Sequence, residues 1–528
     1  MHLLLEYGIT TVFGIPGVHS LDFCNGLSNN SEEGHLRHVQ TRNEQGAGFM
    51  AEGWARATGR PGVAVVISGP GVTNSATALG QCFADSLPFL LISAEPSSDT
   101  IGKGRGVLHE ITEQKLVTTP LTAFSATARQ PEDVPDLLAQ AFAVFSGARP
   151  RPVHISIPID VMAKPVAKRW GALQAPKRNA PRADIIAQAA RLLANATDPA
   201  IMVGGGAIEA SSVLIQLAEK LGAPVICSTA GKGIIPDSHP LCLSASTVRP
   251  EIQNYLREPD VILAIGTELS ETDSFVERLS LTGRIIRIDI DPAKMNDMYP
   301  AELAIVADSL LAVQAILAEL DLHKVVSRFE TTTSRVKALR AEIVKNLSAA
   351  ERRHSVLLMA IRDSAPRETV FSGDACQLVY TGAFMMPIDQ PRKWFYPAGY
   401  CALGNALPNG IGASLALPNT PVAVLVGDGG FMFTMPELVT AAELKLPLPI
   451  VIWENGGLKQ IQDDMDARKI KRVGVEGINP DFFTLAQACH CDAVVPNSIN
   501  EFKVKLSAAF SAQRPTLIVV KETAEWLI

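Results

Sequence analysis

The residues best suited to chemistry follow two apolar runs toward the C-terminal end of the chain. The run 422–426 is followed directly by Gly-Asp-Gly-Gly, with the carboxylate at Asp428, and Asn455 stands just after the run 449–453. A carboxylate beside glycine N–H groups at the start of a helix suits a hard cation together with a phosphate. The 27 positions from Asp428 to Asn455 allow one helix and one return strand, so both side chains can reach one edge of a parallel sheet.

This pattern predicts a magnesium site beside a diphosphate group. Side-chain oxygens of Asp428 and Asn455 and a backbone carbonyl would leave room for two diphosphate oxygens around an octahedral ion. A short glycine motif also occurs in ordinary strand-to-helix turns, and by itself it does not decide between the two interpretations. The Asn at the end of the next predicted strand favours the metal site.

A second glycine loop lies in the N-terminal third of the chain. Ser-Gly-Pro-Gly at 68–71 follows a predicted strand at 63–67 and begins a helix, with Thr73 and Asn74 near its cap. The loop is either a structural turn or the wall of a ligand site, and its sequence supports both interpretations equally.

Length and composition limit the classes of protein that have to be considered. The 528 residues predict about three or four domains, and the formal charge of −7 argues against a nucleic-acid partner. We find no apolar run long enough for a membrane span and no signal peptide. The eight cysteines are scattered, and Cys489 and Cys491 lack a second ligand pair for zinc. We therefore expect reduced core thiols in a cytoplasmic protein.

Short apolar runs alternate with amphipathic stretches along nearly the whole chain. This pattern predicts an α/β fold of three doubly wound parallel-sheet domains, at 1–163, 183–321 and 355–528. The Pro-rich basic segment 164–182 and the charged, partly helical segment 322–354 are predicted to connect them. The apolar start of the chain predicts a helix that lacks its first few residues.

At this point the sequence resembles the thiamine diphosphate enzymes, whose signature is Gly-Asp-Gly followed by a later Asn. Glu-Gln-Gly-Ala at 44–47 and Met-Ala-Glu-Gly-Trp-Ala-Arg at 50–56 are similar to a second pair of motifs in that family. The resemblance implies a pyrimidine-binding N-terminal domain, a Rossmann-like middle domain and a diphosphate-binding C-terminal domain. It also implies that Glu44 is the catalytic acid, which bonds a ring nitrogen and favours the tautomer that acts as a base.

The resemblance also implies the rest of the cofactor site. The loop 397–408 is similar to the family's pyrimidine loop, where Leu403 would wedge between the two rings. The cofactor-binding positions are then Glu44, Gln377, Cys401, Leu403, Gly427, Gly429 and Gly430, and the metal positions are Asp428, Asn455 and Gly457. The expected cofactors are thiamine diphosphate and Mg²⁺.

The middle segment is dinucleotide-like, with glycines at 204–206 after one apolar run and Asp289 and Asp291 after a later one. The glycines do not complete Gly-x-Gly-x-x-Gly. Residues 242–246 also differ from the stretch found at this place in flavin-binding acetolactate synthases. We therefore expect no FAD and an empty middle domain.

His109, in Gly-Val-Leu-His-Glu at 106–110, is the second candidate catalytic residue, because an imidazole titrates near neutral pH. A structural role is the alternative for a lone His. The segments 13–19, 104–110 and 149–155 most resemble 5-guanidino-2-oxopentanoate decarboxylases. That resemblance implies non-oxidative decarboxylation of a 2-oxo acid to an aldehyde by a carboxy-lyase.

Two other functions are kept open. One is an acetolactate synthase-like carboligase, and the other is a flavin or nicotinamide oxidoreductase. For a cationic substrate, Asp463, Asp464 and Asp466 are candidate contacts, although a solvated helix face explains them equally well. Glu454, the stretch 458–460 and Asn43 depart from the family pattern and put the substrate in doubt.

The family resemblance also implies an assembly. The cofactor of such enzymes is clamped between the N-terminal domain of one subunit and the C-terminal domain of another. The expected partners are therefore a small 2-oxo acid and a second copy of the chain, in a homodimer or homotetramer, with no nucleic acid and no membrane.

Overall fold

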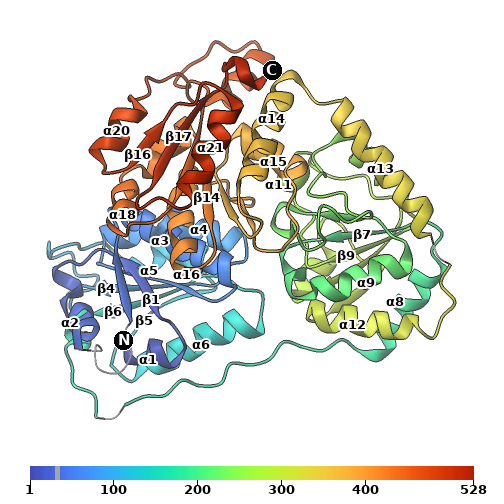
Figure 1. The fold of residues 1–528 in the computed structure, drawn as a ribbon. Helices are drawn as coiled ribbons and strands as arrows, with labels where there is room; N and C mark the ends of the chain where they lie inside the picture. Colours follow the sequence, from blue (N-terminus) through green and yellow to red (C-terminus); the bar gives the residue numbers. More distant parts are fainter. Residues whose placement is uncertain (30–35, 168, 327) are drawn as a thin grey trace.

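Three parallel sheets, each flanked by helices, make up the fold in the computed structural model, which describes residues 1–528 except 30–35, 168 and 327 (Figure 1). The first and third sheets lie close together, and the middle sheet stands beside them. Every pairing between the named strands is parallel, which confirms the predicted α/β class with three sheet domains. Parallel sheets need helices on both faces, and this requirement explains the alternating sequence pattern.

The first sheet has the order β2-β1-β3-β4-β6-β5. Its strands are β1 (Thr11–Gly14), β2 (Arg37–Gln40), β3 (Gly62–Val66), β4 (Phe89–Glu95), β5 (Phe124–Thr127) and β6 (Val153–Pro158). Its helices are α1 (His2–Glu6), α2 (Leu21–Asn29), α3 (Glu44–Thr58), α4 (Pro70–Ala84), α5 (Gln114–Thr118), α6 (Asp133–Gly147) and α7 (Ile159–Met162).

The middle sheet has the order β11-β10-β9-β7-β8. Its strands are β7 (Pro199–Val203), β8 (Val225–Cys227), β9 (Val261–Ile265), β10 (Arg284–Asp289) and β11 (Leu303–Val306). The helices around it are α8 (Ala183–Asn195), α9 (Ser211–Leu221), α10 (Pro250–Tyr255), α11 (Glu271–Ser274), α12 (Ser309–Leu320) and α13 (Phe329–Lys345).

The third sheet has the order β13-β12-β14-β15-β17-β16. Its strands are β12 (Val370–Gly373), β13 (Trp394–Phe395), β14 (Val422–Gly427), β15 (Pro449–Glu454), β16 (Asp492–Val494) and β17 (Thr516–Lys521). Its helices are α14 (Ala349–Ser364), α15 (Gln377–Met385), α16 (Ala406–Ala416), α17 (Asp428–Thr434), α18 (Glu437–Glu443), α19 (Lys459–Ala467), α20 (Phe482–Ala488) and α21 (Ile499–Ala509).

The two predicted connectors differ in the structure. The described part of 164–182 contains no helix or strand and runs as a long strap from the first domain to the second (Figure 1). The second connector is mostly helical, as predicted: 329–345 form α13, and α14 begins at Ala349. Val336 and Ile343 of α13 are buried in a core cluster with residues of the middle sheet. They lie seven positions apart on one helix face, a narrow apolar stripe that the many charges obscure.

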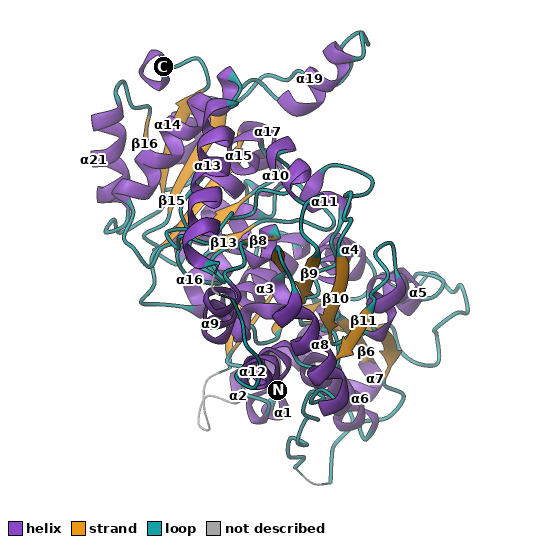
Figure 2. Ribbon diagram, turned by 90° about the vertical axis from the view of Figure 1, so that its right-hand side faces the viewer, coloured by secondary structure: helices purple, strands orange, loops and turns teal. Residues whose placement is uncertain are grey.

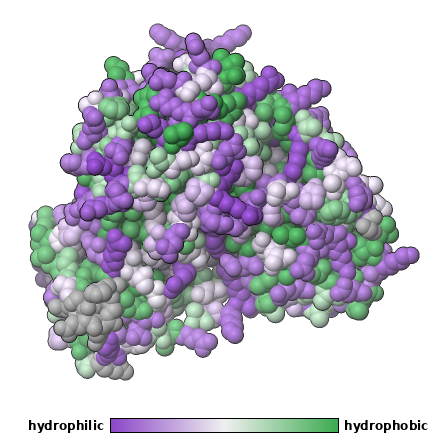
Figure 3. Space-filling view, in the orientation of Figure 1, coloured by the Kyte–Doolittle hydropathy of each residue, from purple (hydrophilic) through white to green (hydrophobic). Residues whose placement is uncertain are grey.

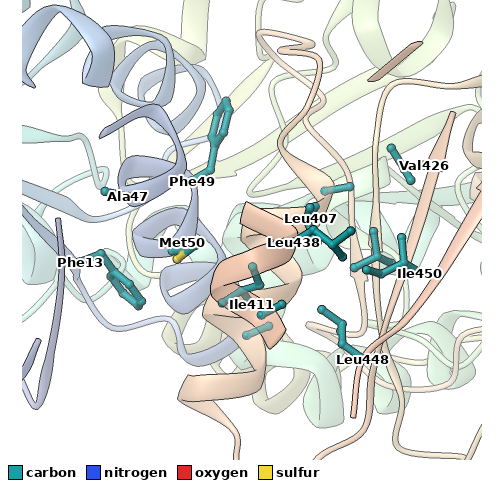
Figure 4. Close-up of a cluster of buried hydrophobic side chains, with 14 of the residues drawn as sticks. Phe13, Ala47, Phe49, Met50, Leu407, Ile411, Val426, Leu438, Leu448 and Ile450 are labelled. Carbon is teal, nitrogen blue, oxygen red and sulfur yellow. The ribbon is translucent and has the colours of Figure 1, made fainter. Parts of the chain in front are cut away.

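The N-terminal and C-terminal domains share one hydrophobic core. Side chains of α3, including Met50, face those of α16 and the third sheet, including Ile411 and Ile450 (Figure 4). Glycines let the two helices approach: a Cβ on Gly53 would lie 2.2 Å from the Asn409 carbonyl oxygen, and one on Gly412 would lie 2.0 Å from that of Met50. The two domains that carry the predicted site are therefore fixed to one another within the chain.

The cysteines are free thiols in the part of the chain that the structure describes, but not all of them lie in the core. Five are buried, whereas Cys24 and Cys376 are half-buried and Cys401 is exposed. The expectation of core thiols is therefore wrong for these three. Cys401 is exposed because it lies in a surface loop, in a left-handed conformation at φ +55°.

The surface agrees with the composition. Hydrophilic side chains cover much of the face shown in Figure 3, with hydrophobic ones scattered among them. Among the described residues, no helix has both the length and the apolar character needed to cross a membrane.

Burial of His154 in β6 gives a pH-dependent contribution to stability. Its ring contacts the hydroxyl oxygens of Ser93 (2.8 Å) and Thr118 (2.8 Å), and burial lowers the pKa of His154 to about 3. The unfolded chain takes up a proton on this ring near pH 6.5 and the folded chain does not, so stability falls as the pH drops below 6.5.

We predict that His154→Gln weakens this dependence. The contribution of the group is about 1.4 kcal/mol per pH unit below 6.5. The unfolding midpoints of the variant at pH 5 and pH 7 should therefore differ less than those of the parent protein. Equal pH dependence in the two proteins would contradict the assignment of a neutral, buried imidazole.

Candidate active site

Glu44 begins α3 and is almost completely buried, with 7% of the residue exposed. The Nδ2 amide of Asn74 donates a hydrogen bond of 2.9 Å to its Oε2. Asn43 caps the helix, and its Oδ1 accepts a hydrogen bond from the Gln45 backbone N–H at 2.8 Å. The carboxyl group is therefore held away from bulk water by a fixed helix start, as a proton-handling acid requires.

The Gly-Pro-Gly loop ties this carboxyl group to the predicted catalytic histidine. Gly69 has φ +59°, and a Cβ there would lie 2.5 Å from the His109 carbonyl oxygen. The Gly69 N–H donates to Oε1 of the buried Gln114 at 2.8 Å. Pro70 then opens α4, which carries Asn74. The loop is therefore packed directly against the segment that contains His109.

His109 lies beside a second imidazole that the sequence analysis did not single out. The rings of His19 and His109 are 5.2 Å apart, and His19 Nδ1 lies 2.6 Å from Ser68 Oγ. Burial, together with the neighbouring His109, lowers the pKa of His19. The Nδ1 atom of His109 is buried and has no hydrogen-bond partner among the described residues, so a bound ligand could satisfy it.

Asp428, at the end of β14, is fully buried and surrounded by N–H donors. Its Oδ2 accepts hydrogen bonds from the backbone N–H groups of Asn455 (3.3 Å), Gly456 (2.8 Å) and Gly457 (3.2 Å). The Nδ2 amide of Asn479 donates to the same oxygen at 2.8 Å. The structure therefore brings Asp428, Asn455 and Gly457 together, as predicted, and it adds Asn479.

The glycines around Asp428 form a close-fitting cradle. A Cβ on Gly427 would lie 3.1 Å from Cys376 Cβ, one on Gly429 3.2 Å from Leu458 Cδ2, and one on Gly430 3.1 Å from the Asp374 carboxyl group. Carboxylate, amide and carbonyl oxygens are the donors that Mg²⁺ prefers, and glycine N–H groups suit phosphate oxygens. The residues present therefore fit a magnesium-bound diphosphate group.

The loop before α16 contains Cys401 and Leu403, the predicted pyrimidine contacts. Cys401 is exposed and Leu403 is half-buried. Both polar side-chain atoms of Asn405, in the same loop, are buried without a hydrogen-bond partner among the described residues, as is Oε1 of Gln377. Unsatisfied buried polar atoms are uncommon in folded proteins, and those of Asn405 and Gln377 lie in segments predicted to contact a cofactor, where a ligand could satisfy them.

Asp374 holds this loop and was not predicted as a site residue. Its carboxylate accepts hydrogen bonds from the backbone N–H groups of Gly404 (2.9 Å) and Ala406 (3.3 Å). Burial raises the pKa of Asp374 to about 6, against the effect of these N–H donors. It follows the end of β12 as Asp428 follows β14, so the same rule of polar residues at the ends of parallel strands could have found it.

The three acids proposed for a cationic substrate are already partnered. Asp463 lies in an ion pair with Lys459 and accepts from Gln377 Nε2 at 3.0 Å. Asp466 pairs with Arg472 at 2.6 Å, and Asp464 accepts from Gln460 Nε2 at 3.3 Å. They belong to α19, which lies on an arm that extends from the third domain (Figure 2). These contacts weaken the hypothesis that the acids bind a substrate cation.

The middle domain contributes a separate feature. A cleft of about 890 Å³ lies between it and the other domains, and its lining includes Gly205, Arg149, Arg178 and Asp289. Its volume is in the range of small-molecule sites. Residues of the dinucleotide-like sequence pattern therefore line this cleft, whereas Glu44 and Asp428 do not.

Comparison with known proteins identifies the class. Residues 1–116, 186–316 and 374–520 match the N-terminal TPP-binding, central and C-terminal TPP-binding domains of thiamine pyrophosphate enzymes. The chain belongs to the thiamine pyrophosphate enzyme family, and the predicted family is confirmed.

Two kinds of enzyme are found among the curated relatives. The chain is 46% identical over 524 residues to a probable 2-ketoarginine decarboxylase of Pseudomonas aeruginosa, covering 99% of this chain and 93% of that protein. It is 31% identical to a probable acetolactate synthase large subunit of Methanocaldococcus jannaschii, covering 98% of this chain and 90% of that protein. It is also 31% identical to the acetolactate synthase isozyme 1 large subunit of Escherichia coli, covering 87% and 81%.

Proposed function

We propose that the chain catalyses the thiamine diphosphate- and Mg²⁺-dependent, non-oxidative decarboxylation of a 2-oxo acid to an aldehyde. The substrate that we favour is 5-guanidino-2-oxopentanoate, which is 2-ketoarginine. The observation that carries the proposal is the 46% identity to a probable 2-ketoarginine decarboxylase over 99% of the chain, against 31% for acetolactate synthases.

Different residues would hold the two ends of the cofactor. Asp428, Asn455 and Gly457 would hold Mg²⁺ and, with the glycines of the cradle, the diphosphate group, while Glu44 would hold the aminopyrimidine ring. When bound, thiamine diphosphate supplies an electron sink for the carbanion that remains after CO₂ leaves. The carboxyl group of Glu44 is almost completely buried, where it would exchange a proton with the bound ring.

His109 is proposed to deliver or accept a proton at the reacting end of the substrate. We predict that His109→Ala lowers kcat by about 10²-fold, because a positioned acid or base contributes roughly that factor. The affinity for thiamine diphosphate, measured by titrating the metal-loaded protein, should change little. An unchanged kcat would assign His109 a structural role instead.

The two-domain site also supports a dimer as the smallest active unit. Exposed apolar side chains lie beside both halves of the site: Val18 and Leu108 next to the two histidines, and Met432 and Phe433 in α17 just after Asp428. A second copy of the chain could cover these exposed apolar side chains. We further propose a cytoplasmic location and domain limits of 1–163, 183–321 and 355–528.

In the decisive test, the protein is reconstituted with thiamine diphosphate and Mg²⁺. It is then incubated with a panel of 2-oxo acids with and without a guanidinium group. Mass spectrometry should detect the aldehyde of the guanidino substrate and an equal amount of CO₂. Acetolactate or another ligation product from pyruvate would favour the carboligase alternative, which the acetolactate synthase relatives support. A flavin absorption band in the purified protein would favour an oxidoreductase that uses the middle-domain cleft.

A further inference from the structure

A carboxylate of the C-terminal domain holds the chain just before Glu44. Glu437, the first residue of α18, is 1% exposed, and its Oε1 accepts hydrogen bonds from the backbone N–H groups of Arg42 (2.9 Å) and Asn43 (3.0 Å). Its Oε2 accepts from Thr440 Oγ1 at 2.7 Å. The two main-chain groups that Glu437 holds therefore belong to the residues that immediately precede the predicted catalytic acid.

The sequence around position 44 makes room for this contact. A Cβ on Gly46 would lie 2.2 Å from Glu437 Oε1 and 2.6 Å from its Cδ, so only glycine allows the carboxylate to reach the helix start. The side chain of the capping Asn43 accepts a hydrogen bond from the N–H of Gln45. Together with the bond from Asn74 to the Glu44 side chain, these contacts leave the start of α3 little freedom.

A buried carboxylate at this position is costly, which argues that it has a role. The Arg42 guanidinium also lowers the pKa of Glu437, but its ion pair is with the exposed Glu443 at 2.7 Å. Burial raises the pKa of Glu437, and the hydrogen bonds from Thr440 and the Arg42 and Asn43 backbone offset this only in part. Costly buried acids of this kind are typical of functional sites.

We propose that Glu437 is a positioning residue that sets the place of the Glu44 carboxyl group from the C-terminal domain of the same chain. The inference rests on the proposed function, in which Glu44 of one subunit and Asp428 of another serve one cofactor. Under that arrangement, Glu437 acts on the site that uses its own chain's Glu44. It does not act on the site that uses its own chain's Asp428.

The first test needs no cofactor. Hydrogen exchange of the cofactor-free protein should be at least about 10-fold faster at the amides of residues 42 and 43 in Glu437→Ala than in the parent, because the two N–H groups lose their acceptor. Glu437→Gln keeps an acceptor oxygen and should restore protection and activity together. The matched control is Glu443→Ala, which removes an exposed partner of the same Arg42 and should change neither. The proposal would be overturned by unchanged exchange in Glu437→Ala. It would also be overturned if Glu437→Gln lost as much protection and activity as Glu437→Ala.

The second test separates the two sites by co-expressing differently tagged variants. Glu437→Ala alone should lower kcat by about 10²-fold, the effect of a small misplacement of a catalytic group. Oligomers that combine a Glu437→Ala chain with an Asp428→Asn chain should recover activity. The recovery should equal that of the control pair, which combines Glu44→Gln with Asp428→Asn. Recovery of the control pair alone would show that Glu437 serves its own domain's site and would overturn the inference. Failure of the control pair would instead contradict the shared site of the proposed function, and hydrogen exchange would then decide the role of Glu437.

Discussion

Replacing Glu44 with glutamine is expected to lower kcat by at least about 10³-fold, within the range that a positioned acid or base contributes. The amide is close to isosteric and can still accept the bond from Asn74, so helix α3 should stay intact. What it loses is the exchangeable carboxyl proton. The effect should therefore fall on kcat and not on folding.

The measurement is steady-state kinetics of the reconstituted variant, together with its melting temperature and its titration with thiamine diphosphate and Mg²⁺. Glu132→Gln, at an exposed position, is the matched control and should behave like the parent. A Glu44→Gln variant with parental kcat would remove the proton-handling role from this residue.

Replacing Asp428 with asparagine should weaken binding of Mg²⁺ and thiamine diphosphate by at least about 10²-fold. Even residues that only hydrogen-bond to metal ligands change metal affinity by about 10–100-fold when they are mutated. The change removes the negative charge that attracts the ion. It also places an amide donor where Oδ2 now accepts three backbone N–H groups, so the loop 455–457 loses its acceptor.

Titration of the cofactor-free protein with Mg²⁺ and thiamine diphosphate, followed by intrinsic fluorescence or calorimetry, measures this loss directly. Asp492→Asn, on the edge strand β16 and exposed, removes the same charge far from the glycine cradle and is the control. Parental affinity in Asp428→Asn would mean that the cradle does not bind the metal-diphosphate group.

The parts of the site that could be predicted from sequence are those that short segments encode. Asp428 and Asn455 were predictable because the ends of parallel strands meet at one sheet edge, and the structure places them there. Glu44 was assigned through family motifs within a few residues of it. The loop at 68–71 was also predictable, because Pro70 opens a helix after a strand.

The residues that sequence analysis missed depend on how distant segments pack. Glu437 contacts Arg42 and Asn43, which lie almost 400 positions away in the sequence. The sequence around position 437 does not predict that contact. Asn479 reaches Asp428 from a loop without regular structure, and His19 approaches His109 only when the two loops fold together. The packing of helix α13 against the middle domain was not predicted, because its few buried residues are outnumbered by charged ones.

Under the proposed function, two chains share each cofactor, with Glu44 from one and Asp428 from the other. The most direct test of this arrangement is to co-express Glu44→Gln and Asp428→Asn chains, each inactive alone, and to purify the doubly tagged oligomers. In each doubly tagged dimer, one of the two sites combines the intact halves, so the purified mixed dimers should recover about half of the parental activity per chain. If every mixed oligomer stayed as inactive as the separate variants, each site would be built within one chain and the account would be wrong.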